Sequence, residues 1–220
     1  MRNPTTEIPE AEVVRELQLA EFGSVHGVTT DDRGNLWFAY GDGGLACVEP
    51  ASGRVLRRFP EFGATAGTTF DGTHVWQITR DRIVKLDPES GEIVHSIPQP
   101  EDCHCSGMAW AEGSLWVGNY DGKQLVKLDP ETGAVRKRLD VDRFVTGVTW
   151  IDGELWHGTW AKPDEDDTGA ELRVIDRDSG KVERRLRMPA RIPVSGIGAD
   201  AQGRLWCGGS AKGGIFGVRR

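Results

Sequence analysis

The chain has 220 residues, with 27 Lys and Arg against 34 Asp and Glu and a formal net charge of −7. This acidic balance argues against sequence-independent binding to nucleic-acid phosphates or to an anionic membrane, so neither partner is expected. Residues 1–12 are polar and no later stretch approaches the length of a membrane span. We therefore expect a cytoplasmic protein whose four cysteines stay reduced.

Five copies of one pattern organise the chain. Each copy starts with a small residue or His followed by Gly, continues through a short β-branched or aromatic run and a turn, and then reaches a Trp. The glycines are spaced by 40 residues three times and then by 49: Gly27, Gly67, Gly107, Gly147 and Gly196. One tryptophan follows each of these glycines at a nearly constant distance: Trp37, Trp76, Trp116, Trp156 and Trp206. Such a period with four short strands per copy is typical of propeller blades.

The sequence therefore predicts one all-β domain over residues 1–220, a five-bladed antiparallel β-propeller. The expected blades cover residues 25–60, 65–98, 105–140, 145–188 and 194–220, the last completed by residues 12–20.

The two ends of the chain predict how the ring closes. Residues 13–19 alternate between apolar and polar side chains, as a half-buried strand does. Residues 21–27 match residues 61–67, which follow an outer strand, so residues 13–19 should be an outer strand as well. The last copy stops after its third strand. We expect the first strand of the chain to complete the last blade and remove an open sheet edge.

The sequence also predicts the turns within blades, one acidic loop and the role of the basic outer strands. Residues 87–91 and 129–133 read Asp-Pro-Glu-Ser/Thr-Gly, which predicts hairpins between third and fourth strands. Residues 161–170 lengthen a loop of the fourth blade with four carboxylates. A solvated loop is favoured there, with a Ca²⁺ or Mg²⁺ site as the alternative. The basic outer strands are interpreted as protected edges and not as a nucleic-acid surface.

The mouth of the central channel is the expected ligand site, because loops before first strands and after second strands open on the same face. The residues just before the repeat glycines should form an inner ring: His26, Ala66, Ser106, Thr146 and Ser195. The loops above them offer candidate substrate-binding residues: Arg80, Tyr120, Trp160 and Tyr40, with Asp121, Arg143 and Arg191 nearby.

The most unusual local signal is Cys103-His104-Cys105, directly before the ring residue Ser106. Thiolate and imidazole are preferred ligands of zinc and copper ions, and His26 could add a further ligand from the ring. We thus take His26, Cys103, His104 and Cys105 as candidate catalytic or metal-binding residues. The alternative is that these cysteines are merely packed, as free cysteines often are. A disulfide between them would be strained and is not expected in a reducing cell.

His157 and Cys207 follow the repeat tryptophans of adjacent blades and are further candidate metal ligands. The equivalent positions in other blades are mostly apolar, which favours buried packing for both residues.

Segments such as Gly-Asn-Leu-Trp-Phe (34–38) and Leu-Val-Lys-Leu-Asp-Pro (125–130) resemble the repeats of streptogramin lyases and gluconolactonase-like propellers. The five-blade count resembles the plant- and bacterial-type glutaminyl cyclases. The resemblance covers nearly the whole chain but lies in structural repeat residues, which imply fold and not activity. The His and Glu set of the lyases and the Thr-Gln-Gly-like motif of the cyclases are both missing, so neither catalytic set is carried over.

These observations favour a small-molecule enzyme of lyase or hydrolase type, with a metal-based or thiol–imidazole site at the channel mouth. The expected metal is a divalent or copper ion, no organic cofactor is indicated, and a monomer is plausible. One alternative is a non-catalytic ligand-binding or protein-interaction propeller. Another is a glutaminyl-cyclase-like aminoacyl cyclotransferase, which would need a mouth carboxylate such as Asp102 or Asp121.

Overall fold

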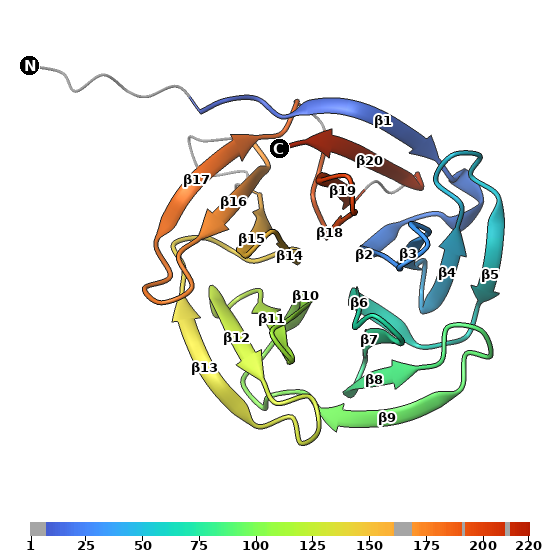
Figure 1. Ribbon diagram of the computed structural model, residues 1–220, viewed down its shortest axis with the longest axis horizontal. Helices are drawn as coiled ribbons and strands as arrows, with labels where there is room; N and C mark the ends of the chain where they lie inside the picture. Colours follow the sequence, from blue (N-terminus) through green and yellow to red (C-terminus); the bar gives the residue numbers. More distant parts are fainter. Residues whose placement is uncertain (1–7, 161–168, 191, 210–211) are drawn as a thin grey trace, which may run out of the picture.

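The computed structural model describes residues 8–160, 169–190, 192–209 and 212–220. Within them, five four-stranded antiparallel sheets surround a central channel as the blades of a propeller (Figure 1). The predicted fold is therefore confirmed.

The first two blades contain β2 (Val25–Thr30), β3 (Leu36–Tyr40), β4 (Gly44–Val48) and β5 (Val55–Phe59), then β6 (Ala64–Phe70), β7 (Val75–Thr79), β8 (Arg82–Leu86) and β9 (Ile93–Pro98). The next two contain β10 (Cys105–Ala111), β11 (Ser114–Asn119), β12 (Gln124–Leu128) and β13 (Val135–Asp140), then β14 (Val148–Ile151), β15 (Glu154–Thr159), β16 (Glu171–Ile175) and β17 (Val182–Arg187).

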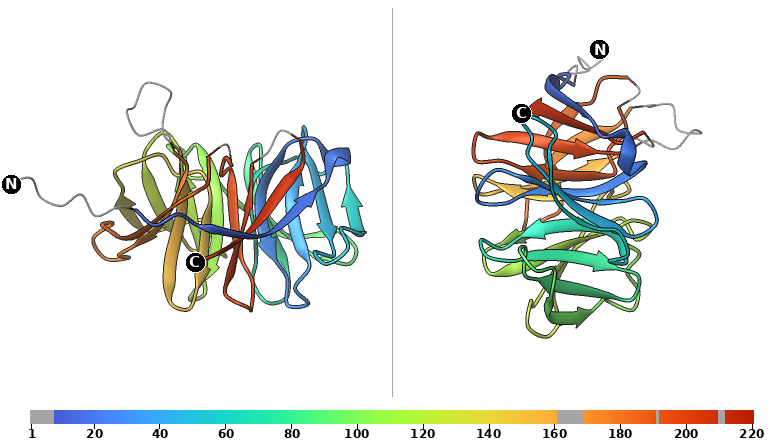
Figure 2. Two further views of the ribbon diagram at one scale, coloured as in Figure 1. Left: turned by 90° about the horizontal axis from the view of Figure 1, so that it is seen from above. Right: turned by 90° about the vertical axis from the view of Figure 1, so that its right-hand side faces the viewer.

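The last blade joins the two ends of the chain, as the sequence predicts. It consists of β18 (Gly196–Ala199), β19 (Arg204–Gly208), β20 (Gly214–Arg219) and, on the outside, β1 (Glu12–Gln18). The antiparallel register of β1 with β20 runs from Glu12 opposite Arg219 to Gln18 opposite Gly214. Figures 1 and 2 show β1 lying along the outer edge of this blade.

The segment just before β1 reaches across to the neighbouring blade. The amide of Ala11 donates to the carbonyl of Arg187 at 2.8 Å, and the amide of Arg187 donates to the carbonyl of Pro9 at 2.8 Å. The start of the described chain thus pairs with β17 of the fourth blade as well as with the last blade. One segment thus pairs with the edge of β20 and with the end of β17 at Arg187.

The third-to-fourth strand turns form as their residues dictate. The carboxylate of Asp87 accepts backbone N–H groups from Glu89 at 3.0 Å and Ser90 at 2.8 Å, and Gly91 takes a φ of 75°. Asp129 and Gly133 repeat the arrangement in the third blade. An Asp side chain that caps its own turn and a Gly at positive φ are the local features that specify such hairpins.

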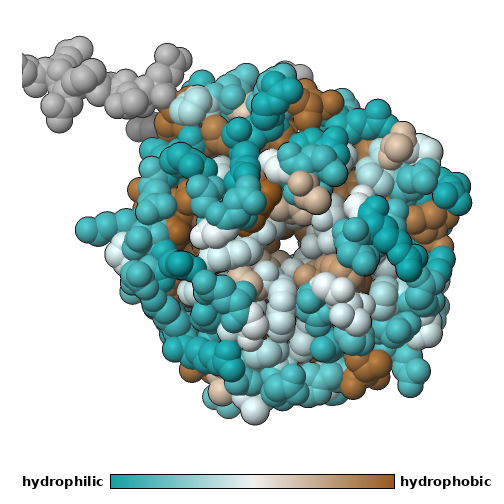
Figure 3. Space-filling model, viewed as in Figure 1, coloured by the Kyte–Doolittle hydropathy of each residue, from teal (hydrophilic) through white to brown (hydrophobic). Residues whose placement is uncertain are grey.

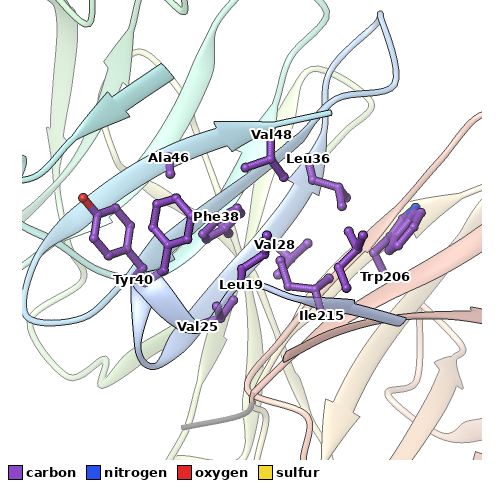
Figure 4. Packing of buried hydrophobic residues seen from close by; sticks show 12 residues of the cluster. Leu19, Val25, Val28, Leu36, Phe38, Tyr40, Ala46, Val48, Trp206 and Ile215 are labelled. Atoms are coloured by element: carbon purple, nitrogen blue, oxygen red, sulfur yellow. The ribbon is translucent and has the colours of Figure 1, made fainter. Parts of the chain in front are cut away.

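The repeat tryptophans are buried between blades, each with at most 2% of its surface exposed. Each one packs against the next blade around the ring. Figure 4 shows this for Trp206 of the last blade, whose apolar cluster includes Val28 and Leu36 of the first blade. Burying a large aromatic side chain in this way contributes several kcal/mol, because the interior is close-packed. The interfaces between blades are therefore the core of the molecule.

Carboxylates before or within the second strands accept the indole N–H groups of four repeat tryptophans. The acceptors are Asp31 for Trp37 (3.1 Å), Asp71 for Trp76 (2.9 Å), Glu154 for Trp156 (3.1 Å) and Asp200 for Trp206 (2.8 Å). The indole nitrogen of Trp116 has no partner in the described part of the chain. Sequence reasoning missed these pairs, although an Asp at a nearly constant distance before Trp in three copies was a usable signal.

The repeat glycines bring the first strands together around the channel. A Cβ atom added to Gly27 would lie 2.6 Å from the Cα of Gly67, and one added to Gly107 would lie 2.5 Å from the Cα of Gly147. Gly196 closes the circle, at 2.7 Å from the Cα of Gly27. Figure 3 shows the channel opening at the centre of a mainly hydrophilic face. Glycine is required here because neighbouring backbones approach too closely for any side chain.

Two sequence expectations fall partly outside the described residues. The acidic loop expected over 161–170 is described only at residues 169 and 170, and Arg191 is not described. Among the residues that are described, no helix has the length and apolar character needed to cross a membrane.

Candidate active site

A cavity of about 490 Å³ lies at the channel mouth. Its wall is built from the starts of first strands, the ends of second strands and the loops that lead into first strands. Seven residues predicted from the sequence as catalytic, metal-binding or substrate-binding line it: His26, Arg80, Cys103, His104, Cys105, Tyr120 and Trp160. The other lining residues are Thr65, Ala66, Ile78, Thr79, Gln99, Ser106, Thr146 and Ser195. Of these, Gln99 and the three β6–β7 residues Thr65, Ile78 and Thr79 were missed by sequence reasoning.

Three predicted candidates lie elsewhere. Tyr40 is packed in the core of the first blade, where its hydroxyl accepts a hydrogen bond from Arg58 Nε at 3.0 Å. His157 and Cys207 are fully buried inside the fourth and fifth blades. None of the three lines the cavity. The packing interpretation of His157 and Cys207 fits their positions, and all three are left out of the site proposed below.

The Cys103-His104-Cys105 loop is held in place by Asn119, a buried residue at the end of β11. The Asn119 amide oxygen accepts the His104 N–H at 3.2 Å, and its amide nitrogen donates to the Asp102 carbonyl at 3.0 Å. The amide of Tyr120 donates to the His104 carbonyl at 2.9 Å. The loop is thereby fixed to the outgoing end of β11 by both backbone and side-chain hydrogen bonds. Asn119 was not identified from the sequence.

His104 forms a pair with Asp121 at the lip of the cavity. His104 Nδ1 lies 2.7 Å from Asp121 Oδ2, and both side chains are largely exposed, at 71% and 69%. An ionised carboxylate only accepts hydrogen bonds, so Nδ1 carries the proton and Nε2 of a neutral ring keeps its lone pair. A carboxylate that fixes the tautomer of a histidine is the arrangement of a general base.

The two thiols of the loop touch one another. Cys105 Sγ lies 2.7 Å from Cys103 Sγ, and Cys103 Sγ lies 3.9 Å from the carbonyl of Gly118. The hydrogen bond to Cys103 and then burial raise the pKa of the Cys105 thiol well above its usual range. Cys105 therefore stays protonated at neutral pH and reacts with incoming molecules less readily than an ordinary thiol. The partly exposed Cys103 is the more accessible of the two sulfurs.

Aromatic rings form one wall of the cavity. Tyr120 stacks on Phe144 with a centroid separation of 4.9 Å, and its ring meets the His104 ring edge-on at 5.8 Å. The indole N–H of Trp160 donates to the Tyr120 hydroxyl at 2.9 Å. Trp160 is 37% exposed, unlike the five repeat tryptophans. These contacts fix the Tyr120 ring and leave a face of Trp160 for a ligand.

Among the described residues, the lining of the cavity carries basic groups and no carboxylate. Arg80 is exposed and forms no ion pair or hydrogen bond with the described residues. His26 Nε2 lies 3.4 Å from Ser24 Oγ, and Thr146 Oγ1 is buried without a hydrogen-bond partner in the described part. The unpaired guanidinium of Arg80 favours an anionic ligand, because Arg binds carboxylate and phosphate through two parallel hydrogen bonds.

The carboxylates expected at the mouth are engaged at its margin. Asp121 contacts His104, and Asp102 pairs with Arg138 at 2.7 Å, away from the cavity lining. In the described residues, no group of three or more His, Cys, Asp and Glu side chains is arranged to hold a metal ion. The donor set present, two touching thiols with the intervening imidazole turned to Asp121, does not fit the expected metal site. The metal stays a prediction, and no step is derived through it.

Comparisons with known proteins support the fold. No protein-family model matches the sequence, and no curated protein matches it. A solved glutaminyl cyclase from Myxococcus xanthus is similar with a TM-score of 0.77 and 17% sequence identity, over 97% of this chain and 98% of its own. A solved streptogramin B lyase is similar with a TM-score of 0.50 and 16% identity, over 89% of this chain and 65% of its own. The resemblance to both propeller groups predicted from the sequence is confirmed, and at these identities it shows the fold alone.

Proposed function

We propose that the chain is an enzyme of lyase or hydrolase type that acts on a small anionic molecule at the channel mouth. The observation that carries the proposal is the His104–Asp121 pair at the lip of a cavity whose Arg80 has no partner among the described residues. His104 Nε2 would take a proton from the substrate or from an attacking water. Arg80 would hold a carboxylate or phosphate of the substrate, and Trp160 would cover its apolar part.

The roles of the remaining lining residues follow from their chemistry. His26 can donate a hydrogen bond to the same anion or to an oxyanion that develops during the reaction. Cys103 is the accessible thiol of the lining, so a thiol-based mechanism would use Cys103 as the nucleophile. The similarity of fold to two solved enzymes supports an enzymatic function without indicating which reaction is catalysed.

The experiment uses probes of each reaction class that carry an anionic group. Half-esters of dicarboxylic acids with 4-nitrophenol and aryl phosphates report hydrolysis, and β-substituted carboxylates report elimination through absorbance of the alkene. His104→Gln should lower kcat by about 100-fold or more, the usual contribution of a general base. Arg80→Gln should mainly raise KM for anionic probes and leave their uncharged analogues unaffected.

Two matched variants serve as controls. His95→Gln changes a histidine on the outer strand β9, and Arg82→Gln changes an exposed arginine that pairs with Asp81 outside the cavity. Both should keep full activity. If no probe is turned over, while anions bind to the wild type and bind more weakly to Arg80→Gln, the protein is a binding module and the enzymatic proposal fails.

A second candidate is an aminoacyl cyclotransferase, favoured by the whole-length likeness to a glutaminyl cyclase. Peptides with N-terminal glutamine would be incubated with the protein, and loss of ammonia would be followed by mass spectrometry. In this chain the carboxylate of Asp121 contacts the cavity-lining His104. Cyclisation that is lost in Asp121→Asn and retained in Asp102→Asn would establish this function. No cyclisation by the wild type would reject it.

A further inference from the structure

Two cysteine sulfurs converge on the wall of the mouth cavity. Cys103 Sγ and Cys105 Sγ lie 2.7 Å apart, and both residues line the cavity. Cys105 begins β10, and Cys103 lies two residues earlier in the loop that Asn119 holds in place. The intervening His104 projects away, toward Asp121. The sulfurs are thus placed to react with one another.

We propose that Cys103 and Cys105 form a reversible thiol–disulfide site that exchanges electrons with a small disulfide entering the cavity. The pair is asymmetric. Cys103 is partly exposed and meets the incoming molecule first, whereas Cys105 is only 8% exposed and stands in contact behind it. The other two cysteines, Cys47 in β4 and Cys207 in β19, are buried in separate blades and have no access to the cavity.

The exchange proceeds in two balanced steps. In the first step the Cys103 thiol gives up its proton, and its sulfur attacks one sulfur of the small disulfide. The S–S bond of the small molecule breaks and a mixed disulfide with Cys103 forms. The first small thiol leaves with the proton that Cys103 gave up. The Cys105 sulfur then attacks Cys103 Sγ, forms the Cys103–Cys105 bond and expels the second small thiol, which takes the Cys105 proton. The protein pair loses two electrons, and one small disulfide becomes two thiols.

Exposure makes the product easy to reduce. Cys103 is partly exposed at the cavity wall, so an external thiol can reach its sulfur. Exposed disulfides are the labile ones and are readily reversed by thiols. This agrees with the sequence expectation that the pair is reduced at rest, and it gives the site a reversible rather than a structural role.

The test titrates the full chain with mixtures of oxidised and reduced glutathione, followed by acid quenching, N-ethylmaleimide alkylation and peptide mass mapping. The wild type should lose two of its four alkylatable thiols without gaining glutathione mass, and the peptide containing residues 103–105 should carry an internal disulfide. Excess reduced glutathione should restore all four thiols.

Variants separate the two steps. Cys105→Ser should stop after the first step and retain one glutathione on Cys103. Cys103→Ser should react at least about tenfold more slowly, since the remaining sulfur is shielded. Cys47→Ala is the control and should behave as the wild type, with circular dichroism melts confirming that each variant is folded. A wild type that keeps four alkylatable thiols at the most oxidising ratio, or that accumulates a stable mixed disulfide, overturns the proposal.

Discussion

The indole nitrogen of Trp116 is the unsatisfied member of a repeated pattern. In the second blade Asp71 accepts hydrogen bonds from the indole of Trp76 and from Lys85 Nζ at 3.2 Å. The aligned residue of the third blade is Ala111, five positions before Trp116, and Lys127 lies over the Trp116 ring at 5.5 Å. The third blade therefore has both donors, but in the described residues the Trp116 indole lacks an acceptor and Lys127 pairs instead with Glu112 at 3.6 Å.

Ala111→Asp should stabilise the protein. The new carboxylate would accept the buried indole N–H and pair with Lys127, for a gain in unfolding free energy of about 1 kcal/mol. Urea unfolding of the two proteins measures the difference. The converse variant, Asp71→Ala, should destabilise by about 1–3 kcal/mol because it leaves Trp76 unpaired. A loss of stability in Ala111→Asp would mean that the carboxylate is buried without its partners.

His157 should make stability depend on pH. Burial is the main cause that lowers its pKa from 6.5 to about 4, with the nearby Arg173 guanidinium acting in the same direction. Between pH 6.5 and about pH 4, His157 is therefore protonated in the unfolded chain and neutral in the folded chain. Stability is thus complete above pH 6.5 and declines as the pH falls to about 4, by about 3 kcal/mol in total.

The matched variant is His157→Gln, because Gln77 occupies the equivalent position of the second blade fully buried. Urea unfolding of both proteins between pH 7 and pH 4 gives the unfolding free energy of each as a function of pH. The carboxylates affect both proteins equally, so the difference between the two slopes reports His157 alone. Parallel slopes for the two proteins would contradict a buried neutral histidine.

At the scale of elements, β1 stabilises two blades at once. Its side chains Leu17 and the following Leu19 are each 6% exposed and belong to the cluster between the last and first blades. Deleting residues 1–20 would remove both leucines and expose the edge of β20. Truncating one buried leucine alone costs about 2–5 kcal/mol.

We therefore expect the truncated chain to aggregate or to melt well below the full chain in differential scanning calorimetry. Removing residues 1–8 is the control and should have little effect, since the paired segment begins at Pro9. An unchanged melting temperature after deletion of residues 1–20 would show that β1 does not hold the ring closed.

Elements and site were not equally predictable from the sequence. The hairpins were predicted because an Asp cap and a Gly specify the turn within five residues, as at Asp87 and Gly91. The position of the Cys-His-Cys loop at the mouth followed from the repeat register. Its conformation did not, because it depends on hydrogen bonds from Asn119, 15 residues away. Tyr40 was assigned to the mouth because it is the last residue of β3. In the structure its ring packs against Phe22 and lies in the core instead.

At the scale of the whole molecule, the glycine ring explains why the repeat can close with only five blades. Few blades leave a narrow channel, so the first strands must come within backbone contact of one another. Each repeat glycine meets the backbone of the next copy: an added Cβ at Gly67 would lie 2.5 Å from the amide nitrogen of Met108, and at Gly107 2.3 Å from that of Val148. The glycine therefore recurs in every copy because the backbone contact between neighbouring first strands requires it in every blade.

Gly107→Ala should disrupt this ring. The methyl group would meet the backbone of Gly147 and Val148 on the neighbouring strand, which cannot rotate away as a side chain can. Overpacking typically costs about 1–3 kcal/mol, and because the obstacle here is backbone we expect the upper end of that range or more. Gly169→Ala is the matched control, since among the described residues its Cβ would meet the Arg187 side chain alone, at an ordinary 3.5 Å. Urea unfolding should separate the two variants by at least about 2 kcal/mol. Equal stability would mean that the first strands can move apart, and that the channel is wider in solution than the repeat glycines imply.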